Sequence, residues 1–405
     1  MLREEDTVSM EYFVSLERAR EIASLVSIET TEEEVSLDEA HGRVLSRDIR
    51  SLVDDPPFDN SSMDGFAVLH KDTPGRLKII GTSQAAAMDE LSMGQGEAVR
   101  IMTGAQMPSG ADAIIMIEKT SISDDGEWVD ILEEAKPNWI RRKGENLRKG
   151  EISLSSGTKL LPHNLGLIAT MGHPSAKVYS PLRVSIISTG DELKSPGEEL
   201  SPGEIYESNS FGLAGLVKEL GCIPIRTGAC ADSLSALREA LDYAAENSDL
   251  IITSGGVSMG EWDLVRKIME EEGDIHYWRV KIRPGSPPIF GIWKGTPLFG
   301  VPGNPVSSHV VFRMLVRPWI LNQFNIQEPY DTIVPVRLLE DLKATEDCFT
   351  LRRVYVENVD GELVASTKTH QGSGNLNSLV TSNALTYLPP GSTAKKGEKI
   401  DVILL

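Results

Sequence analysis

The sequence has 405 residues, enough for about two to four domains of ordinary size. Its content of 40% hydrophobic and 25% charged residues is typical of a globular protein and excludes a mainly disordered chain. A net charge of −20 argues against nucleic acid or a membrane surface as a partner. Three cysteines without a Cys-x-x-Cys pair favour a reducing compartment over a disulfide framework. Without an apolar run of membrane-spanning length or a signal peptide, we expect a soluble cytoplasmic protein.

The N-terminal part of the chain predicts two domains that are interleaved in sequence. Apolar residues recur at helical spacing over 11–26, and the Gly-terminated segment 160–172 predicts a short helix. Between them lies a long Pro- and Asp-rich loop, 54–65, followed by short β-like runs separated by turn residues. We therefore expect a small helical linker domain, 1–50 with 151–180, and a β-rich domain, 51–150.

The second half begins with regular alternation of strands and helices. Strands are predicted at 183–189, 223–228, 249–256, 277–282, 288–293 and 296–301, and helices at 208–221, after Asp232, at 263–272 and at 306–324. This alternation predicts a doubly wound parallel α/β domain over 181–327. The last segment, 328–405, returns to short β runs and predicts a small barrel or sandwich. The expected fold class is thus multi-domain, α/β plus β.

Three polar loops that contain glycine follow strands of the predicted α/β domain. They read STGDEL, TSGGVSMGEWD and VPGNPVSS. Ligands of doubly wound sheets bind beyond the carboxyl ends of the strands, where glycines let the backbone approach an anion. Each loop alone is also compatible with an ordinary strand-to-helix turn. Together they predict an anion site formed by Gly190, Ser254, Gly255, Gly256, Ser258, Gly303, Asn304 and Ser307.

The same loops carry Asp191, Glu192, Asp232 and Asp263, whose simplest alternative role is helix capping. Acidic side chains next to an anion require a cation between them, and Mg²⁺ takes carboxylate and phosphate oxygens together. One basic segment, WRVKIRPGSPP, brings Arg279, Lys281 and Arg283 toward this region unless it is simply a solvated strand face.

Two further polar segments lie in the predicted β-rich domain. DNSSMDG contains Asp64, and IMTGAQMPSG places Thr103 after a strand. The composition of both segments is equally compatible with surface turns.

The chain resembles the molybdopterin molybdenumtransferase family of the MoeA type. The resemblance rests on nine segments in the family's order, spanning residues 56–380. They read PPFDNSSMDGFAV, VRIMTGAQMPSGADAIIMIE, RRKGENLRKGE, SIISTGDEL, GEIYESNSFGLAGLVKELG, IITSGGVSMGEWD, VKIRPGSPPIFG, FGVPGNPVSS and HQGSGNLNSLV. One such segment would be weak evidence, whereas nine in order indicate the family.

The resemblance implies a Mg²⁺-dependent transferase of molybdenum cofactor biosynthesis. Such an enzyme exchanges the adenylyl group of adenylylated molybdopterin for molybdate or tungstate and releases AMP. It also implies a homodimer, in which the β-rich domain of one subunit faces the α/β domain of the other, and a functional link to the molybdopterin adenylyltransferase. By position in the motifs, the implied catalytic residues are Asp64, Thr103, Glu192, Asp232 and Asp263. Asp191, Glu192 and Asp263 are the implied metal ligands, and Pro302 and Pro305 are the paired prolines of PGNP.

Two positions depart from the family's usual pattern. Ser286 stands where a second lysine is usual in the basic strand, so it offers only a neutral hydrogen bond to the oxyanion. Asn146 stands where many relatives carry an aspartate. Both changes leave the identity of the oxyanion open between molybdate and tungstate.

Two other classes of function are compatible with the sequence. The first is an adenylyltransferase or nucleotide hydrolase on the same α/β fold, although SGGVS differs from the TGGTG of the adenylyltransferases. AMP release without any requirement for molybdate would identify it. The second is a non-catalytic scaffold, for which we would expect a long linker or a partner-binding extension.

Overall fold

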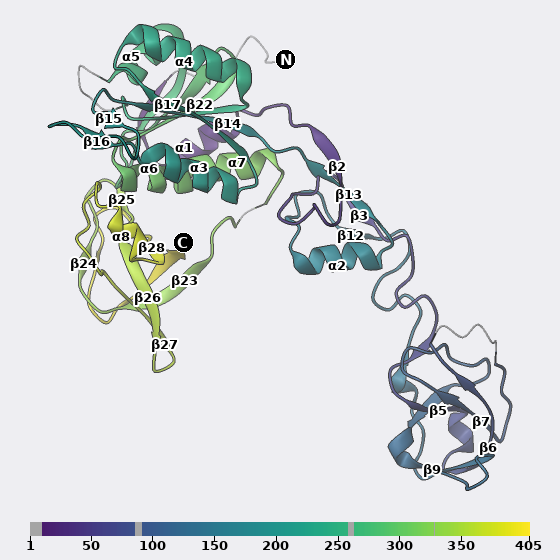
Figure 1. Ribbon diagram of the computed structural model, residues 1–405. Helices are drawn as coiled ribbons and strands as arrows, with labels where there is room; N and C mark the ends of the chain where they lie inside the picture. The colour runs from purple at the N-terminus through teal and green to yellow at the C-terminus, as the bar shows by residue number, and fades with distance from the viewer. Residues whose placement is uncertain (1–9, 86–90, 258–262, 328) are drawn as a thin grey trace. The chain divides into compact units, whose positions relative to one another are not determined.

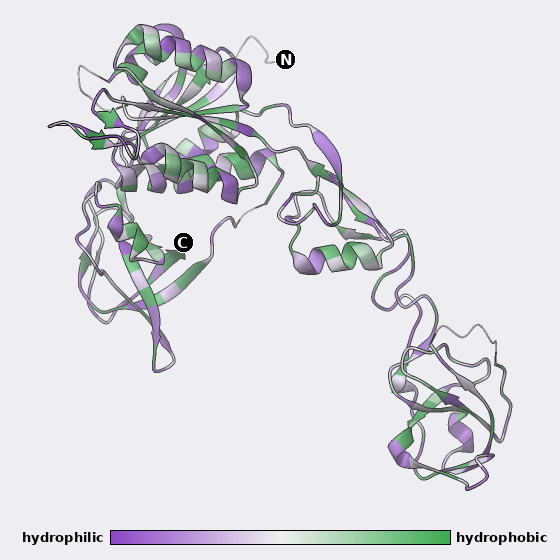
Figure 2. Cartoon of the chain, in the orientation of Figure 1, coloured by the Kyte–Doolittle hydropathy of each residue, from purple (hydrophilic) through white to green (hydrophobic). Residues whose placement is uncertain are grey.

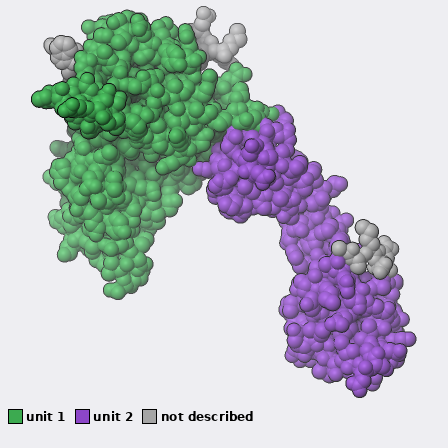
Figure 3. Space-filling view, viewed as in Figure 1, with its two compact units in different colours: residues 1–33, 179–405 green, residues 34–178 purple. Residues whose placement is uncertain are grey.

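The computed structural model describes residues 10–85, 91–257, 263–327 and 329–405. The chain divides into two compact units, residues 1–33 with 179–405 and residues 34–178 (Figures 1 and 3). We describe each unit by itself. Across the described ranges, no helix combines the length and the apolar character needed to cross a bilayer.

The first unit is built around a seven-stranded sheet with the order β1-β19-β21-β22-β18-β14-β17. The strands are β1 (Glu11–Val14), β14 (Arg183–Thr189), β17 (Ile223–Cys230), β18 (Leu250–Ser254), β19 (Asp274–Val280), β21 (Ile289–Trp293) and β22 (Thr296–Val301). The four strands β17, β14, β18 and β22 run parallel, so their carboxyl ends meet at one edge.

Helices cover both faces of this sheet (Figure 1). The helices α4 (Leu234–Asn247) and α5 (Leu264–Glu272) pack on one face. The other face carries α1 (Leu16–Ser24), α3 (Asn209–Glu219), α6 (Pro305–Val311), the π-helical turn η4 (Phe312–Val316) and α7 (Arg317–Gln323). Hydrophobic and hydrophilic residues alternate along these helices, as expected for elements with one buried face (Figure 2). The expected α/β fold class is confirmed.

The sheet is not parallel throughout, because β21 runs antiparallel to both β19 and β22. The cause is a two-residue hairpin between β21 and β22. Lys294 and Gly295 both have positive φ, 47° and 87°, which is the conformation of a tight primed turn. A two-residue connection cannot accommodate the helical crossover that parallel neighbours require.

The apolar spacing predicted a single helix over 11–26, and this prediction is wrong. Residues 11–14 form β1, which pairs in parallel with β19 at the edge of the sheet, and α1 begins only at Leu16. Ser15 separates the two elements, and its side chain accepts a hydrogen bond from the backbone N–H of Arg18 at 3.1 Å. The N-terminal strand therefore belongs to the α/β sheet and not to a linker domain.

The predicted helix over 306–324 is interrupted by η4, which ends two residues before Pro318. Proline has no N–H to donate to the carbonyl four residues earlier, that of Met314. Arg20 on α1 supplies the missing donor, since its Nε lies 2.8 Å from that oxygen.

The C-terminal part of this unit is a closed five-stranded barrel with the order β23-β27-β26-β28-β30. Its strands are β23 (Ile333–Leu338), β26 (Arg353–Val359), β27 (Glu362–Ser366), β28 (Ala384–Thr386) and β30 (Lys399–Leu404). The short strands β24 (Leu342–Lys343) and β29 (Thr393–Ala394) pair beside it, and α8 (Asn377–Val380) precedes β28. The barrel joins the α/β domain where β20 (Ile282–Arg283) pairs in parallel with β25 (Phe349–Thr350). Of the two alternatives predicted for this region, the barrel is confirmed.

The second unit contains a six-stranded sheet with the order β8-β5-β7-β6-β10-β9. Its strands are β5 (Gly65–Val68), β6 (Gly75–Ser83), β7 (Glu97–Ile101), β8 (Ala113–Met116), β9 (Thr120–Ile122) and β10 (Trp128–Ile131). Shorter pairs are β2 (Glu32–Ser36) with β13 (Ser175–Tyr179), β3 (Ile49–Arg50) with β12 (Ile152–Leu154), and β4 (Asn60–Ser61) with β11 (Ile140–Arg141). The helix α2 (Pro162–Thr170) and the 3-10 turns η1 (His70–Asp72), η2 (Ile117–Lys119) and η3 (Pro137–Trp139) complete it.

Candidate functional site

A cavity of about 670 Å³, here called the rim cavity, opens at the carboxyl ends of the parallel strands. The loops that follow β14, β17, β18 and β22 all contribute to its wall. Most of the residues predicted for this rim line it: Gly190, Glu192, Asp232, Ser254, Gly255, Gly256, Asp263, Pro302, Gly303, Asn304 and Pro305. Asp191 does not line the cavity but is adjacent in the chain to two residues that do. Ser258 lies outside the described residues.

Two glycines after β18 allow the backbone to form part of this wall. Gly255 and Gly256 have φ of 97° and 66°, in the region that favours glycine. A Cβ at Gly255 would lie 2.9 Å from Oγ1 of Thr189, and one at Gly256 would lie 3.0 Å from Cγ2 of Val265. The loop therefore requires glycine at both positions, as a backbone cradle for an anion would.

Asp191 and Asp232 bind each other's backbone at the edge of the cavity. The N–H of Asp232 donates to Oδ1 of Asp191 at 3.0 Å, and the N–H of Asp191 donates to Oδ2 of Asp232 at 3.3 Å. Burial and the negative charges of Asp191 and Glu192 raise the pKa of the Asp232 carboxyl. Asp232 does not cap α4, since Ser233 does so by accepting from the N–H of Ala236. Helix capping therefore does not explain the position of Asp232 beside Asp191.

Two rim-cavity residues that the sequence analysis missed hold the loops in place. The side-chain amide of Asn209 donates to Oγ of Ser254 at 2.8 Å and to the carbonyl of Gly303 at 2.7 Å, so it connects the loops after β18 and β22. Glu207 is 5% exposed and accepts from the hydroxyl of Ser188 and the N–H of Ser210. The only signal in the sequence was their place in YESNS, directly before a predicted helix.

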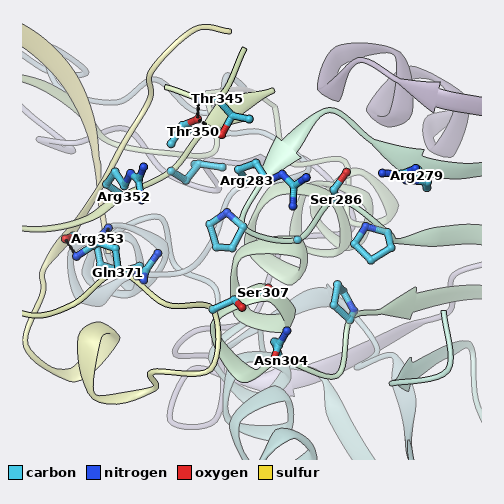
Figure 4. Close-up of a pocket in the computed structure, with 16 residues that line it drawn as sticks. Arg279, Arg283, Ser286, Asn304, Ser307, Thr345, Thr350, Arg352, Arg353 and Gln371 are labelled. Atoms are coloured by element: carbon cyan, nitrogen blue, oxygen red, sulfur yellow. Dashed lines mark hydrogen bonds between the residues drawn. The ribbon is translucent and has the colours of Figure 1, made fainter. Parts of the chain in front are cut away.

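A second cavity of about 470 Å³, here called the arginine cavity, lies between the α/β domain and the barrel (Figure 4). It shares Pro287, Pro302 and Asn304 with the rim cavity. Of the residues predicted to bind an anion, Arg279, Arg283, Ser286, Pro302, Asn304 and Ser307 line it. The barrel contributes residues that were not predicted: Thr345, Thr350, Leu351, Arg352, Arg353, Gln371 and Ser373.

Arg353 is the most unusual of these residues because it is only 1% exposed. Its Nε donates to Oγ of Ser378 at 3.0 Å and its Nη2 donates to the carbonyl of Gly372 at 3.1 Å. Burial, together with the neighbouring charge of Arg352, lowers the pKa of its guanidinium to about 10, so it stays charged at neutral pH. Within the described ranges, neither Arg283, Arg352 nor Arg353 forms a salt bridge with a carboxylate. Of the three, Arg353 is buried, Arg352 is half-buried and Arg283 is exposed. A buried cation without a paired anion is costly, so a cavity with Arg353 in its wall is suited to bind an anion.

Two residues of the basic segment do not serve the cavity as predicted. Lys281 is not part of its wall, and Nζ of Lys281 lies 5.5 Å from the ring centroid of Phe13. Ser286 lines the cavity, but it is 3% exposed and its hydroxyl donates to the carbonyl of Val280 at 3.1 Å. In this conformation the hydrogen of Ser286 is engaged within its own loop and is not offered to an anion.

In the second unit, Asp64 and Thr103 are brought together although they are distant in sequence. The N–H and the hydroxyl of Thr103 donate to Oδ1 of Asp64 at 2.6 and 2.8 Å. The Thr103 N–H, followed by its hydroxyl, lowers the pKa of the Asp64 carboxyl. Asn146 donates to Oδ2 of Asp55 at 2.9 Å, a bond that an ionised aspartate at position 146 could not donate.

The sequence matches three family profiles in succession. Residues 14–172 match the MoeA N-terminal region (domain I and II), residues 185–322 a probable molybdopterin binding domain, and residues 335–405 the MoeA C-terminal region (domain IV). The α/β domain, whose strand ends form the rim cavity, thus belongs to the class of molybdopterin-binding domains.

Individual relatives agree over almost the whole length. A molybdopterin molybdenumtransferase of Haemophilus influenzae is 36% identical over 384 residues, covering 93% of this chain and 94% of that protein. One from Bacillus subtilis is 34% identical, covering 92% and 89%. The crystal structure of a molybdopterin biosynthesis MoeA protein from Pyrococcus horikoshii is similar with a TM-score of 0.85 and 30% identity, covering 97% of this chain and 100% of that one. The chain belongs to the molybdopterin molybdenumtransferase (MoeA) family.

Proposed function

We propose that this protein inserts molybdate, or tungstate, into adenylylated molybdopterin with release of AMP. The observation that carries this proposal is the pair of adjoining cavities, one with acidic and glycine-bearing loops and one lined by four arginines. A substrate with a phosphate anhydride suits the first, and a dianionic metal oxyanion suits the second. Their shared wall at Pro302 and Asn304 would keep both substrates within reach of each other. This reaction is a step of molybdenum cofactor biosynthesis, which we place in the cytoplasm. The molybdopterin adenylyltransferase would supply its substrate, adenylylated molybdopterin.

Within the rim cavity, the backbone around Gly255 and Gly256 would hold the phosphate groups, and the hydroxyl of Ser254 is placed beside them. In the arginine cavity, Arg283, Arg352 and Arg353 would bind the oxyanion through charge-assisted hydrogen bonds. The dithiolene sulfurs that receive the metal belong to the substrate, so no cysteine of this chain is needed at the site.

The residues at the rim fit a bound Mg²⁺. Carboxylate oxygens are its preferred protein ligands, and it is usually held by one or two carboxylates together with substrate phosphates. Glu192, Asp263 and Asp191 would hold it. Burial, followed by the negative charges of Asp191 and Glu192, raises the pKa of Asp232, and a cation at this edge would offset those charges. Among the described residues, no three acidic, His or Cys side chains are gathered closely enough to hold a metal by themselves, so substrate oxygens would have to complete the coordination. When bound, Mg²⁺ screens the charge of the phosphate anhydride.

The proposal includes a homodimer whose active site combines two subunits. Asp64 and Thr103 form a small site of their own in one compact unit, whereas the rim cavity belongs to the other. We propose that Asp64 and Thr103 of one subunit complete the rim cavity of its partner.

The test of this function is the product formed from adenylylated molybdopterin. We expect AMP release to require molybdate or tungstate and to yield a pterin that carries the metal. Chelation of divalent ions should stop AMP release, and added Mg²⁺ should restore it. AMP release at the same rate without any oxyanion would support a hydrolase and contradict the proposal, and full activity after chelation would remove the role of Mg²⁺.

Replacement of Arg283 by Gln should weaken molybdate binding by roughly tenfold or more. The change removes a charge-assisted hydrogen bond, worth roughly 1.5–3 kcal/mol, without emptying the space. Titration calorimetry with molybdate at two salt concentrations measures the loss. Arg238→Gln is the matched control, because Arg238 pairs with Glu272 on the outer helices and lines neither cavity. Equal affinity of Arg283→Gln and wild type would contradict the assignment.

A further inference from the structure

Two bulky residues lie side by side in a left-handed backbone conformation at the edge of the main sheet. Phe13 in β1 has φ of 51° and Arg279 in β19 has φ of 66°. The parallel register pairs Tyr12 with Trp278 and Val14 with Val280, so Phe13 and Arg279 occupy matching positions. Large side chains rarely adopt positive φ, and residues that do so gather at functional sites.

Arg279 is one of the residues that line the arginine cavity, and its guanidinium contacts the aromatic residues of β1. Its Nη1 donates to the hydroxyl of Tyr12 at 2.8 Å. Its Cζ lies 4.9 Å from the ring centroid of Phe13 and 5.7 Å from that of Tyr12. Its backbone N–H donates to the carbonyl of Pro288 at 2.8 Å, so both ends of the residue are fixed.

The ring of Tyr12 also contacts Trp278. Its ring centroid lies 5.2 Å from that of Trp278, and the indole N–H of Trp278 donates to the carbonyl of Val257 at 3.2 Å. Arg266 on α5 lies over the Trp278 ring, with its Cζ 3.9 Å from the ring centroid. The ring of Tyr12 is 50% exposed, and its contact with Trp278 and the bond from Arg279 hold its hydroxyl at the guanidinium as a hydrogen-bond acceptor.

We propose that Tyr12 and Phe13 are positioning residues for the oxyanion substrate. They orient the guanidinium of Arg279 in the arginine cavity, and the strand β1 thereby becomes part of the metal-delivery site. This inference rests on the proposed function, because it assigns the cavity to the oxyanion. A guanidinium presents its N–H groups in a rigid plane, so its orientation decides how well it matches an oxyanion.

The test compares Tyr12→Phe, Arg279→Ala and the double variant, with molybdate as the probe in titration calorimetry. Tyr12→Phe removes one hydroxyl and keeps the ring, and we expect roughly three- to tenfold weaker molybdate binding. In the Arg279→Ala background the same change should have no further effect, since it acts only through Arg279. In turnover assays, KM for molybdate should rise while KM for adenylylated molybdopterin stays within about twofold. Tyr243→Phe on the outer surface of α4 is the matched control.

Three outcomes would overturn the inference. Tyr12→Phe could bind molybdate as tightly as wild type, the losses of the two single variants could multiply in the double variant, or the rise in KM could fall on adenylylated molybdopterin. If Arg283→Gln weakens molybdate binding and Tyr12→Phe does not, the proposed function survives and only this inference fails. If wild type binds no molybdate, both fail. Phe13→Leu, which keeps an apolar side chain but removes the ring, provides a second variant and should weaken molybdate binding in the same direction.

Discussion

Replacement of Glu192 by Gln or of Asp263 by Asn should lower the rate of AMP release by about 100-fold or more and leave stability within about 1 kcal/mol of wild type. Both side chains line the rim cavity, where they would hold Mg²⁺ against the phosphate anhydride. Neither is expected to be needed for folding, because Glu192 is exposed, Asp263 is only half-buried, and both changes keep the size of the side chain. The loss should therefore appear in kcat and not in the amount of folded protein.

Thermal unfolding and single-turnover AMP release, measured on the same preparations, check this result. Glu246→Gln, an exposed change on α4 away from the cavity, is the matched control and should behave as wild type. A variant that unfolds easily but shows normal turnover per folded molecule would mean that these carboxylates support the fold.

An equal mixture of inactive Asp64→Ala and inactive Asp263→Ala subunits should recover about a quarter of wild-type activity. Random pairing gives roughly half heterodimers, and each of these has one intact site of two if the site combines two subunits. The two positions belong to different compact units of the chain, which makes such a combination physically available.

Mixing must be preceded by verified subunit exchange, and the control is a mixture of Asp64→Ala with Thr103→Ala. Asp64 and Thr103 are hydrogen-bonded in one unit, so no pairing of these variants restores an intact site. Absence of recovery in the first mixture after exchange would show that each site is built within a single chain.

The sequence was most informative where local chemistry and topology coincide. The loops with Gly190, Gly255 and Gly303 follow parallel strands, and the rule that such strand ends meet at one edge was sufficient to place them around one cavity. The sequence also placed the Asp232 carboxylate at this rim, although Ser233 and not Asp232 caps the helix that follows.

What could not be predicted depends on contacts between distant segments. Arg352 and Arg353 read as part of an ordinary strand, FTLRRVYVE, and only the packing of the barrel on the α/β domain turns them into a wall of the arginine cavity. The edge strand β1 was hidden because its apolar residues continue the helical spacing of α1, and the pairing partner lies more than 250 residues away. The pair Lys294-Gly295 between two apolar runs was a local signal for a hairpin. The regular alternation of strands and helices in the rest of the domain instead favoured the prediction of a parallel sheet.

The position of Arg352 and Arg353 also bears on how this protein can change over evolutionary time. The barrel has its own hydrophobic core, including Val336, Val354, Ala365 and Val402, so substitutions at its rim need not disturb the sheet that carries the rim cavity. Half of the four arginines that line the arginine cavity come from this separately packed part. If the arginine cavity binds the oxyanion as proposed, preference between metal oxyanions can drift through changes in the barrel alone, while the loops that would hold the nucleotide stay as they are.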